Sequence, residues 1–489
     1  MTSRELAAGS RAVGSLAGHP AVASGLVADS LTGAKPVPYW LDQPGAPEPE
    51  PALAGRTTAG LAVIGGGFTG LWTALLAKER DPSSDVVVLE ARTAAWAASG
   101  RNGGFCSASL THGLANGLQR FGGEIETLER LGRRNLDEIG GAVARYGIDC
   151  GFERTGELTV ATEAWQLAAL QENAQAAWAL GGAPELLDRD RVRAEIDSPA
   201  YLGGLWDRDG CALVDPARLA WGLRRACLDA GVRIHEHAPV TAVRDEGHAG
   251  LRVHTARGSV LTDRAALGTG AYRPLLRRLR HYLVPVYDYV LMTEPLSPAQ
   301  LAGVGWRHRQ GAGGAANQFH YYRLTADNRI LWGGYDAVYY NGGLITSGQD
   351  QRPATFALLA AQFFETFPQL EGLRFSHAWG GVIDTCARFC AFYGTAHGGR
   401  LAYAAGYTGL GVGASRFGAN VMLDLLAGEQ TERTALSMVR SKPVPFPPEP
   451  VRSAVIQLTR ASIARADRNA GRRDLWLRTL DRLGLGFDS

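Results

Sequence analysis

Three glycines and one acidic residue near the beginning of the chain have types and spacing that could bind a nucleotide. Gly65, Gly67 and Gly70 form the pattern G-x-G-x-x-G, and Glu90 follows Gly70 by 20 residues. Glycines allow the backbone to approach a pyrophosphate at a helix N-terminus, where amide groups and the helix dipole favour negative charge. A carboxylate at this distance accepts ribose hydroxyls and repels a 2′-phosphate. The alternative is an ordinary tight turn between a strand and a helix.

The elements around these residues have the order that a nucleotide site requires. A buried strand from residue 61, a glycine turn, a helix ending near residue 80 and a second buried strand at 85–90 follow one another. Short runs of Val, Ile and Leu flank a segment whose apolar residues recur at helical spacing, which is typical of a βαβ unit. Because the glycines lie between the strand and the helix, the pattern favours a dinucleotide site.

A second glycine-rich loop follows at 97–105. It places Ser99, Arg101 and Asn102 among three more glycines and so offers many hydrogen-bond donors. Such a loop suits the long pyrophosphate and ribityl chain of FAD better than the compact nicotinamide end of NAD. The sequence contains no second G-x-G-x-x-G for a nicotinamide cofactor, which argues against a pyridine-nucleotide reductase.

Composition excludes several other classes of protein. The 489 residues include 50 basic and 48 acidic side chains, a balance that does not indicate a nucleic-acid partner. Six cysteines without C-x-x-C pairs indicate no metal site, and ordinary reduced thiols are favoured over a redox role. No apolar run approaches the ~18 residues that cross a bilayer. The first 26 residues lack the pattern of a signal peptide, so we expect a cytoplasmic protein.

The middle of the chain alternates helical and extended patterns. These are a helix at 123–147, an extended segment at 156–163, a return to helix and strand at 215–272, a strand at 283–296 and two strands within 319–336.

One of these strands carries the side chains that we expect to contact a substrate. In an alternating strand His320 and Tyr322 share one face, while Tyr321 and Arg323 share the other. His320 and Tyr322 could hydrogen-bond an amine or a polar tail, and Arg323 could bind a carboxylate through its planar guanidinium. The alternative for Arg323 is a structural ion-pair network with neighbours such as Asp327.

The two ends of the chain differ from the rest. Residues 1–56 are rich in Ala, Gly and Pro and are expected to form an irregular arm. Tyr39 and Trp40 should dock on the protein, because exposure would leave much apolar area in water. Residues 437–489 combine a proline linker with apolar residues at helical spacing. Two interpretations of this tail stay open: a helical segment packed on its own domain, or a basic amphipathic helix that meets a membrane quinone pool or a partner.

Three sequence blocks in order resemble a known family. GGGFTG with Glu90, ASGRNGGF at 98–105, and GYTGLGVGASRFGANVMLDLLAGE at 406–429 are similar to the D-amino-acid oxidase/glycine oxidase superfamily of flavoproteins. The likeness is strongest to its γ-glutamylputrescine oxidoreductase-like branch. Blocks at 210–223, 237–243, 266–272 and 321–336 also match what such proteins carry.

The resemblance implies a set of FAD-binding residues. They would contact the pyrophosphate, the ribose and adenine, the ribityl chain and the flavin ring. They are Gly65, Gly67, Phe68, Thr69, Gly70, Glu90, Ala91, Ser99, Arg101, Asn102, Gly103, Gly104, Val240, Thr269, Gly270, Gly409, Leu410, Gly411 and Val412. No cysteine stands where some relatives attach the flavin, so noncovalent FAD is expected.

The resemblance also implies a fold of the α/β class. A discontinuous Rossmann-like FAD-binding domain would hold an inserted α+β substrate domain with an antiparallel sheet. The FAD-binding domain would comprise 57–110, 205–282 and 376–436, and the substrate domain 111–204 and 283–375. The arm 1–56 and the helical tail 437–489 would flank them.

The activity implied is oxidation of a primary or secondary amine, γ-glutamylputrescine-like or amino-acid-like. Hydride would pass to flavin N5, and water would hydrolyse the imine to an aldehyde or keto product. The electron acceptor would be O2 or a quinone, and no lysine lies between Lys78 and Lys442 to play the oxygen-assisting role found in some relatives. Two alternatives stay open: a specialised natural-product or amino-acid oxidase of the same fold, and a flavin-binding partner protein without turnover.

Overall fold

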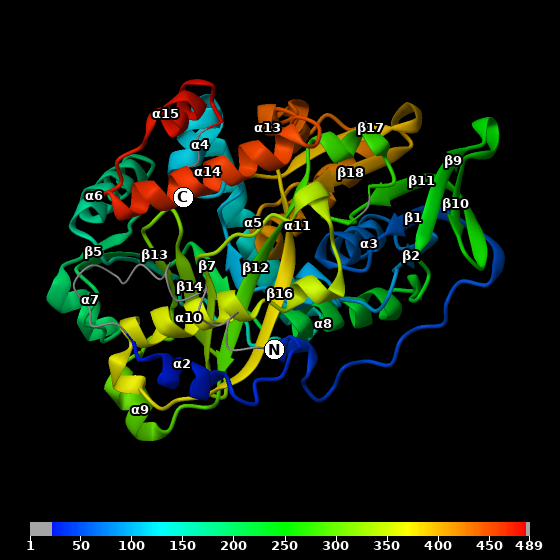
Figure 1. Ribbon diagram of the computed structural model, residues 1–489. Helices are drawn as coiled ribbons and strands as arrows, with labels where there is room; N and C mark the ends of the chain where they lie inside the picture. The colour runs from blue at the N-terminus through cyan, green and yellow to red at the C-terminus, as the bar shows by residue number, and fades with distance from the viewer. Residues whose placement is uncertain (1–21, 273, 486–489) are drawn as a thin grey trace.

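Two large sheets organise the protein. The computed structural model describes residues 22–272 and 274–485. In Figure 1 the sheet that contains β1 and β2 lies at the right, and the sheet that contains β13 and β14 lies at the left. Strands β12 and β16, which belong to the second sheet, run through the centre of the view.

The first sheet begins with the predicted βαβ unit, which is confirmed as β1 (Gly55–Ile64), α3 (Phe68–Arg80) and β2 (Val86–Leu89). Its strand order is β17-β18-β11-β1-β2-β8, with β10 and β9 added beside β11. Strands β8, β2, β1, β11 and β18 are parallel neighbours. The other bounds are β8 (Arg233–His235), β9 (Val240–Asp245), β10 (Leu251–Thr255), β11 (Gly258–Leu267), β17 (Phe392–Ala396) and β18 (Leu401–Ala405). Because these strands come from three distant stretches of sequence, the nucleotide-binding half is discontinuous, as predicted.

The second sheet has the order β16-β12-β15-β14-β13-β4-β6-β5. Its neighbours are antiparallel except for the parallel pair β13 and β4. The bounds are β4 (Glu157–Ala161), β5 (Glu185–Leu187), β6 (Gly203–Asp207), β12 (Val284–Thr293), β13 (Gly311–Gly314), β14 (His320–Leu324), β15 (Ile330–Gly334) and β16 (Phe375–Thr385). A small sheet pairs β3 (Phe105–Ser107) with β7 (Cys211–Leu213). The predicted fold class is therefore confirmed, whereas the domain boundaries remain a prediction.

Helices cover both sheets. Helices α3, α8 (Pro216–Asp229), α11 (Gly411–Ala427) and α5 (Ile125–Arg145) pack together on the first sheet around an apolar core. Helix α10 (Pro353–Thr366) packs on one face of the second sheet, with Phe363 against Trp332. The remaining α-helices are α2 (Ser24–Leu31), α4 (Leu114–Phe121), α6 (Ala164–Ala179), α7 (Arg189–Glu195), α9 (Pro298–Val304), α12 (Glu432–Ala435), α13 (Ser437–Arg440), α14 (Val451–Arg468) and α15 (Leu475–Arg482).

The N-terminal arm is more ordered than its composition predicts. Residues 24–31 form α2, which contacts α10, so the expectation of an irregular arm is wrong there. The Ser30 hydroxyl donates to Val27 O within the helix, and apolar side chains on α2 pack against the second core. A short amphipathic segment thus becomes helical because tertiary packing stabilises it.

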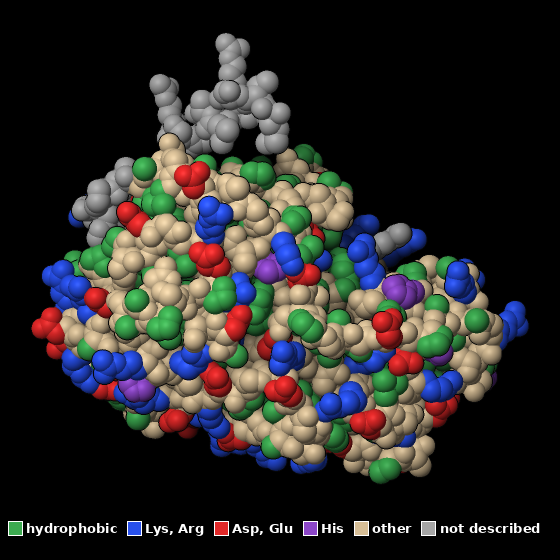
Figure 2. Space-filling model, turned by 90° about the horizontal axis from the view of Figure 1, so that it is seen from below, with side chains coloured by type: hydrophobic (Ala, Val, Ile, Leu, Met, Phe, Trp, Pro, Cys, Tyr) green, Lys and Arg blue, Asp and Glu red, His purple; other side chains and the backbone are tan. Residues whose placement is uncertain are grey.

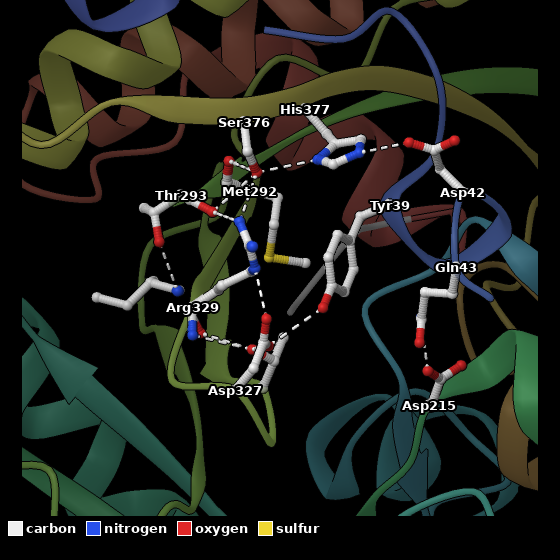
Figure 3. Close-up of polar contacts among 12 residues, drawn as sticks. Tyr39, Asp42, Gln43, Asp215, Met292, Thr293, Asp327, Arg329, Ser376 and His377 are labelled. Atoms are coloured by element: carbon white, nitrogen blue, oxygen red, sulfur yellow. Dashed lines mark hydrogen bonds and ion pairs between the residues drawn. The ribbon is translucent and has the colours of Figure 1, made fainter. Parts of the chain in front are cut away.

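The docking of Tyr39 and Trp40 is confirmed. Trp40 is 3% exposed and donates from Nε1 to the carbonyl of Asn102 at 2.9 Å. Figure 3 shows the polar contacts that fasten the arm: Tyr39 donates to Asp327 at 3.1 Å, and Asp42 contacts His377 at 3.2 Å. The arm therefore touches the loop at 97–105 directly.

The surface has no single-sign charge field in the view of Figure 2, where basic and acidic side chains are interspersed. No helix within the described part of the chain is long and apolar enough to cross a membrane. Most of the 26 residues used to exclude a signal peptide lie outside the described residues.

Candidate functional site

A cavity of about 1120 Å³ lies between the two sheets. Its lining begins at the glycine turn after β1 and passes the loop at 97–105. It continues to the face of the second sheet opposite α10, and ends against α14 and α15. A cavity of this size, built by elements of both sheets, can hold a dinucleotide and a small substrate together.

The glycine turn is built by close backbone contacts. Gly65 has φ of +112°, and a Cβ there would lie 2.6 Å from the carbonyl oxygen of Gly268. A Cβ on Gly70 would lie 1.8 Å from Gly65 O. Gly70 therefore lets α3 approach the turn rather than facing the cavity, and it is absent from the lining. Gly67 is the N-cap of α3 and lines the cavity.

The carboxylate of Glu90 is buried at the edge of this turn. One oxygen accepts from Gly66 N at 2.6 Å, and the other accepts from Arg92 N at 2.8 Å and Trp96 Nε1 at 2.7 Å. Burial raises the pKa of Glu90, and these three donors oppose that shift. A carboxylate has about four acceptor positions, so one remains for a ribose hydroxyl.

The loop at 97–105 is held by its own polar side chains. Ser99 Oγ accepts from Phe68 N at 2.9 Å, which ties the loop to the first turn of α3. Arg101 contacts Asp350 at 2.6 Å and donates to Trp96 O at 2.8 Å. Ser99, Arg101 and Asn102 line the cavity.

Two helices begin at the cavity without a side-chain cap. At α3 the N-cap is Gly67, and at α11 it is Leu410, which follows Gly409 with φ of +92°. At α3 the Phe68 amide is already bonded to Ser99 Oγ, but the other first-turn amides and the positive end of each helix dipole favour negatively charged groups. The pair fits a diphosphate at α3 and the electron-accepting end of a flavin at α11, so the residues present fit FAD.

Most residues predicted to bind FAD line this cavity. They are Gly65, Gly67, Phe68, Thr69, Glu90, Ala91, Ser99, Arg101, Asn102, Gly103, Val240, Thr269, Gly270, Gly409, Leu410, Gly411 and Val412. Gly70 and Gly104 are absent from the lining, and a Cβ on Gly104 would lie 2.1 Å from Val214 O. Direct contact of each residue with FAD stays a prediction.

His320 and Tyr322 do not line the cavity, which contradicts their predicted contact with substrate. The Tyr322 hydroxyl lies 2.5 Å from that of Tyr201, and His320 stacks on Trp332 with ring centroids 4.3 Å apart. This face of the sheet is covered by α10 and by Phe367 directly after it: Phe363 packs on Trp332 of β15, and Phe367 packs on Tyr322. The correction follows from strand alternation: the side chains that face α10 cannot also face the cavity.

Arg323 lies on the other face but does not reach the cavity lining either. It is 4% exposed, and its guanidinium donates to Val214 O at 2.7 Å and to Leu324 O at 3.2 Å. Burial lowers the pKa of Arg323 to about 10. Arg323 therefore has a structural role and does not bind a substrate carboxylate as predicted. Its partners are backbone carbonyls, not Asp327 as the alternative interpretation expected.

Tyr321 is the residue of β14 that faces the cavity, together with Asp288 of β12. The Tyr321 hydroxyl donates to the Asp288 carboxylate. Tyr321 pairs in register with Gly313 on one side and Gly333 on the other. A Cβ on Gly333 would lie 2.6 Å from the Tyr321 ring, so the glycine lets that ring lie across the sheet. Burial raises the pKa of Asp288 to about 6, against the lowering effect of the Tyr321 hydrogen bond.

The sequence interpretation missed this pair, although a signal was available. Asp288 interrupts the alternating valines of β12 on the face that carries Val286 and Val290. A polar residue on an apolar strand face is a stronger indication of a site than one in a mixed strand.

The cavity contains more free acid than free base. Glu157 lines it and has no hydrogen-bond or ion-pair partner in the part of the chain that the structure describes, and burial raises its pKa to about 7. The arginines of the lining are occupied: Arg101 contacts Asp350, and Arg460 contacts Asp336 at 2.6 Å. An entering group with positive charge is therefore favoured over an isolated anion.

Metal chemistry has no support among residues 22–272 and 274–485, where no group of three or more His, Cys, Asp or Glu side chains could hold an ion. All six cysteines are buried free thiols. Burial raises the pKa of Cys386 and of Cys390, which opposes formation of a reactive thiolate.

Comparison with known proteins agrees with this geometry. Residues 61–425 match the family described as DAO, FAD dependent oxidoreductase. The chain is 32% identical over 399 residues to gamma-glutamylputrescine oxidoreductase of Escherichia coli K12, an alignment that covers 79% of this chain and 88% of that protein. It is 28% identical over 405 residues to the probable oxidoreductase OrdL of Haemophilus influenzae, covering 80% of this chain and 88% of that protein.

Solved structures show the same fold. Glycine oxidase from Geobacillus kaustophilus superposes with a TM-score of 0.65 at 19% identity and covers 79% of this chain and 100% of its own. L-proline dehydrogenase from P. horikoshii gives 0.63 at 16% identity, covering 79% and 96%. The family match, the uncapped helices and the glycine turn lead to one conclusion: the chain belongs to the DAO family and is an FAD-dependent oxidoreductase.

Proposed function

We propose that this enzyme oxidises a primary or secondary amine, with a γ-glutamylputrescine-like or polyamine-like compound as the leading candidate. One observation carries the proposal: a single cavity joins the nucleotide turn to a sheet face that presents Tyr321, Asp288 and Glu157. The 32% identity to gamma-glutamylputrescine oxidoreductase supports the same class of substrate.

The protein's part in the reaction is to position the amine and to exclude water. When bound, FAD accepts a hydride from the carbon next to the substrate nitrogen. The nitrogen must be neutral so that its lone pair forms the C=N bond as the C–H bond breaks. Water then hydrolyses the product to a carbonyl compound and ammonia or an amine. Tyr321, fixed by Asp288, would orient the amine, and the α11 N-terminus favours negative charge nearby.

The charge balance of the cavity favours an amine with a second positive group. Glu157 is free to bind an ammonium, whereas Arg101 and Arg460 already have acidic partners. An amino acid carries its carboxylate on the reacting carbon and would need a free cation there. In γ-glutamylputrescine the carboxylate lies at the other end of the molecule, away from the reacting amine. The amino-acid oxidase alternative is kept because the fold permits it.

The remaining details are part of the proposal. FAD is taken to be held without a covalent bond, which agrees with the position of all six cysteines outside the cavity lining. The acceptor is O2 or a quinone, and the enzyme works in the cytoplasm on a small molecule, without nucleic acid. The FAD contacts and domain boundaries predicted from the sequence are also proposed, except for Gly70, which packs against the glycine turn and does not line the cavity.

Anaerobic reduction of the holoenzyme tests the proposal. Putrescine, γ-glutamylputrescine and monoamines should bleach the visible flavin absorbance, and admission of air should then separate an oxidase, which forms peroxide quickly, from a quinone-linked enzyme. Bleaching by amino acids alone would favour the amino-acid oxidase, and no bleaching by any compound would favour a flavin-binding protein without turnover.

Two tyrosine variants give a matched pair. Tyr321→Phe removes a hydroxyl that faces the cavity, whereas Tyr322→Phe removes one buried under α10. We expect the rate of flavin reduction to fall only in Tyr321→Phe, by about tenfold to a hundredfold if one positioning hydrogen bond is lost. Equal effects would remove the role given to Tyr321.

A further inference from the structure

The C-terminal segment, residues 443–485, lies outside the family match yet forms one wall of the cavity. The match ends at residue 425, and the lining includes Val444, Pro445, Phe446 and Pro447, then residues of α14, then Leu480 and Leu485. In Figure 1, α14 crosses the upper part of the molecule and α15 lies beside α4. A bond from Arg120 of α4 to Gly484 O at 2.7 Å agrees with that placement.

One face of α14 is turned to the cavity. Its lining residues are Val455, Ile456, Thr459, Arg460 and Ile463, which share a helix face at one-turn and two-turn spacing. Leu458 lies on the opposite face and is 47% exposed. One face of α14 therefore borders the cavity, and the opposite face is exposed to solvent.

Polar contacts fasten this helix to loops that also line the cavity. Asp467 accepts from Asn317 Nδ2 at 2.7 Å and from Gln318 N at 2.9 Å, at the loop between β13 and β14. Arg460 contacts Asp336 at 2.6 Å, in the loop after β15. These contacts hold α14 against two loops that flank β14 and β15 of the second sheet.

The wall that the segment supplies is mainly apolar. Of its lining residues, Thr459 and Arg460 are polar, and Arg460 is occupied by Asp336. Apolar side chains facing a water-filled cavity gain free energy when an apolar group covers them. The sheet side, by contrast, offers carboxylates for a positive group.

We propose that residues 443–485 form a hydrophobic subsite that binds the alkyl part of the amine substrate. The inference rests on the proposed amine oxidation and adds a substrate requirement: a linear methylene chain that extends beyond the reacting carbon. In a diamine the chain would lie against α14, while the second ammonium meets the acid side of the cavity.

A homologous series of n-alkylamines, from propylamine to heptylamine, tests the subsite. Binding to the oxidised holoenzyme is measured by anaerobic calorimetry, and flavin reduction is measured on the same samples. In the native protein we expect Kd to fall roughly three- to fourfold for each added methylene until the subsite is filled.

Two residues of α14 provide the variant and its control. Ile463→Asn puts a polar group into the subsite and should flatten the chain-length dependence, whereas Leu458→Asn changes the exposed face and should leave it as in the native protein. Ile463→Trp, which fills space instead, should weaken heptylamine binding while sparing propylamine. It serves as the second variant if Ile463→Asn does not fold.

The outcomes separate this inference from the proposed function. Chain-length dependence that is equal in Ile463→Asn and Leu458→Asn, or absent in the native protein, overturns the subsite. Dependence that disappears in Ile463→Asn supports it even if no alkylamine reduces the flavin, a result that would count against amine oxidation alone. Flavin reduction without any chain-length dependence would support amine oxidation and overturn the subsite.

Discussion

Replacement of Glu90 by glutamine should weaken FAD binding and lower the stability of the apoprotein by comparable amounts. The native carboxylate accepts three N–H groups and keeps one acceptor position free toward the cavity. Glutamine has a single acceptor oxygen, and its amide nitrogen must face at least one of those donors. The variant therefore has too few acceptor positions for both the three protein N–H groups and a ribose hydroxyl.

The size of the effect follows from these bonds. A hydrogen bond from a ribose hydroxyl to a charged acceptor contributes about 1.5–3 kcal/mol, so its loss should raise the Kd for FAD roughly tenfold to 150-fold. Leaving one buried N–H unpaired should lower the free energy of unfolding of the apoprotein by about 1–3 kcal/mol.

Glu236→Gln is the matched control. Glu236 is 1% exposed and accepts from Glu50 N at 2.7 Å and from Arg224 at 2.9 Å, but it does not line the cavity. The assay is titration of each apoprotein with FAD, with thermal unfolding measured in parallel. An unchanged Kd in Glu90→Gln, or an equal rise in Glu236→Gln, would refute the assignment of Glu90 to the ribose.

Three further changes test other parts of the molecule. Gly70→Ala should destabilise the protein by about 1–3 kcal/mol or more through the clash with Gly65 O, whereas Gly141→Ala on α5, whose Cβ would meet no atom within 4 Å, should stabilise it by up to about 1 kcal/mol; urea unfolding compares them. Trp40→Ala should lower the free energy of unfolding by about 3–5 kcal/mol, whereas Trp178→Ala, at a side chain that is 46% exposed, should change it little. A fall in melting temperature for Trp40→Ala no larger than that for Trp178→Ala would show that the arm is dispensable for stability. Because burial raises the folded pKa of Asp288 to about 6 from 3.8, the folded state binds this proton more tightly than the unfolded chain, and stability falls as pH rises from about 4 to about 6. After allowance for cavity water, the free energy of unfolding should change by about 1–2 kcal/mol less over this pH range in Asp288→Asn than in the native protein. An equal change with pH in the two proteins would contradict this.

The nucleotide half was predictable because its signals are local. The strand, turn and helix around Gly65 and Gly67 are contiguous, and the contacts that require glycine arise within the unit or against the neighbouring strand. Helix α2 was not predictable in this way, because eight residues with few helix signals become helical only by packing on α10.

The face of β14 could not be read from its own residues. His320, Tyr321, Tyr322 and Arg323 put a polar group on both sides of the strand, so alternation alone cannot say which side is buried. That choice depends on α10 and on Phe367 directly after it, which come later in the chain: Phe363 packs on Trp332, and Phe367 packs on Tyr322.

The neighbouring strands carry the information that β14 lacks. Tyr321 is flanked in register by Gly313 and Gly333, while Tyr322 is flanked by Ala312 and Trp332. A large ring can lie along a sheet toward a cavity where its cross-strand neighbours have no side chains, and it packs into a core where they do. Strand pairing therefore selects Tyr321 as the cavity residue, and pairing of non-adjacent segments is the property that a single sequence specifies least directly.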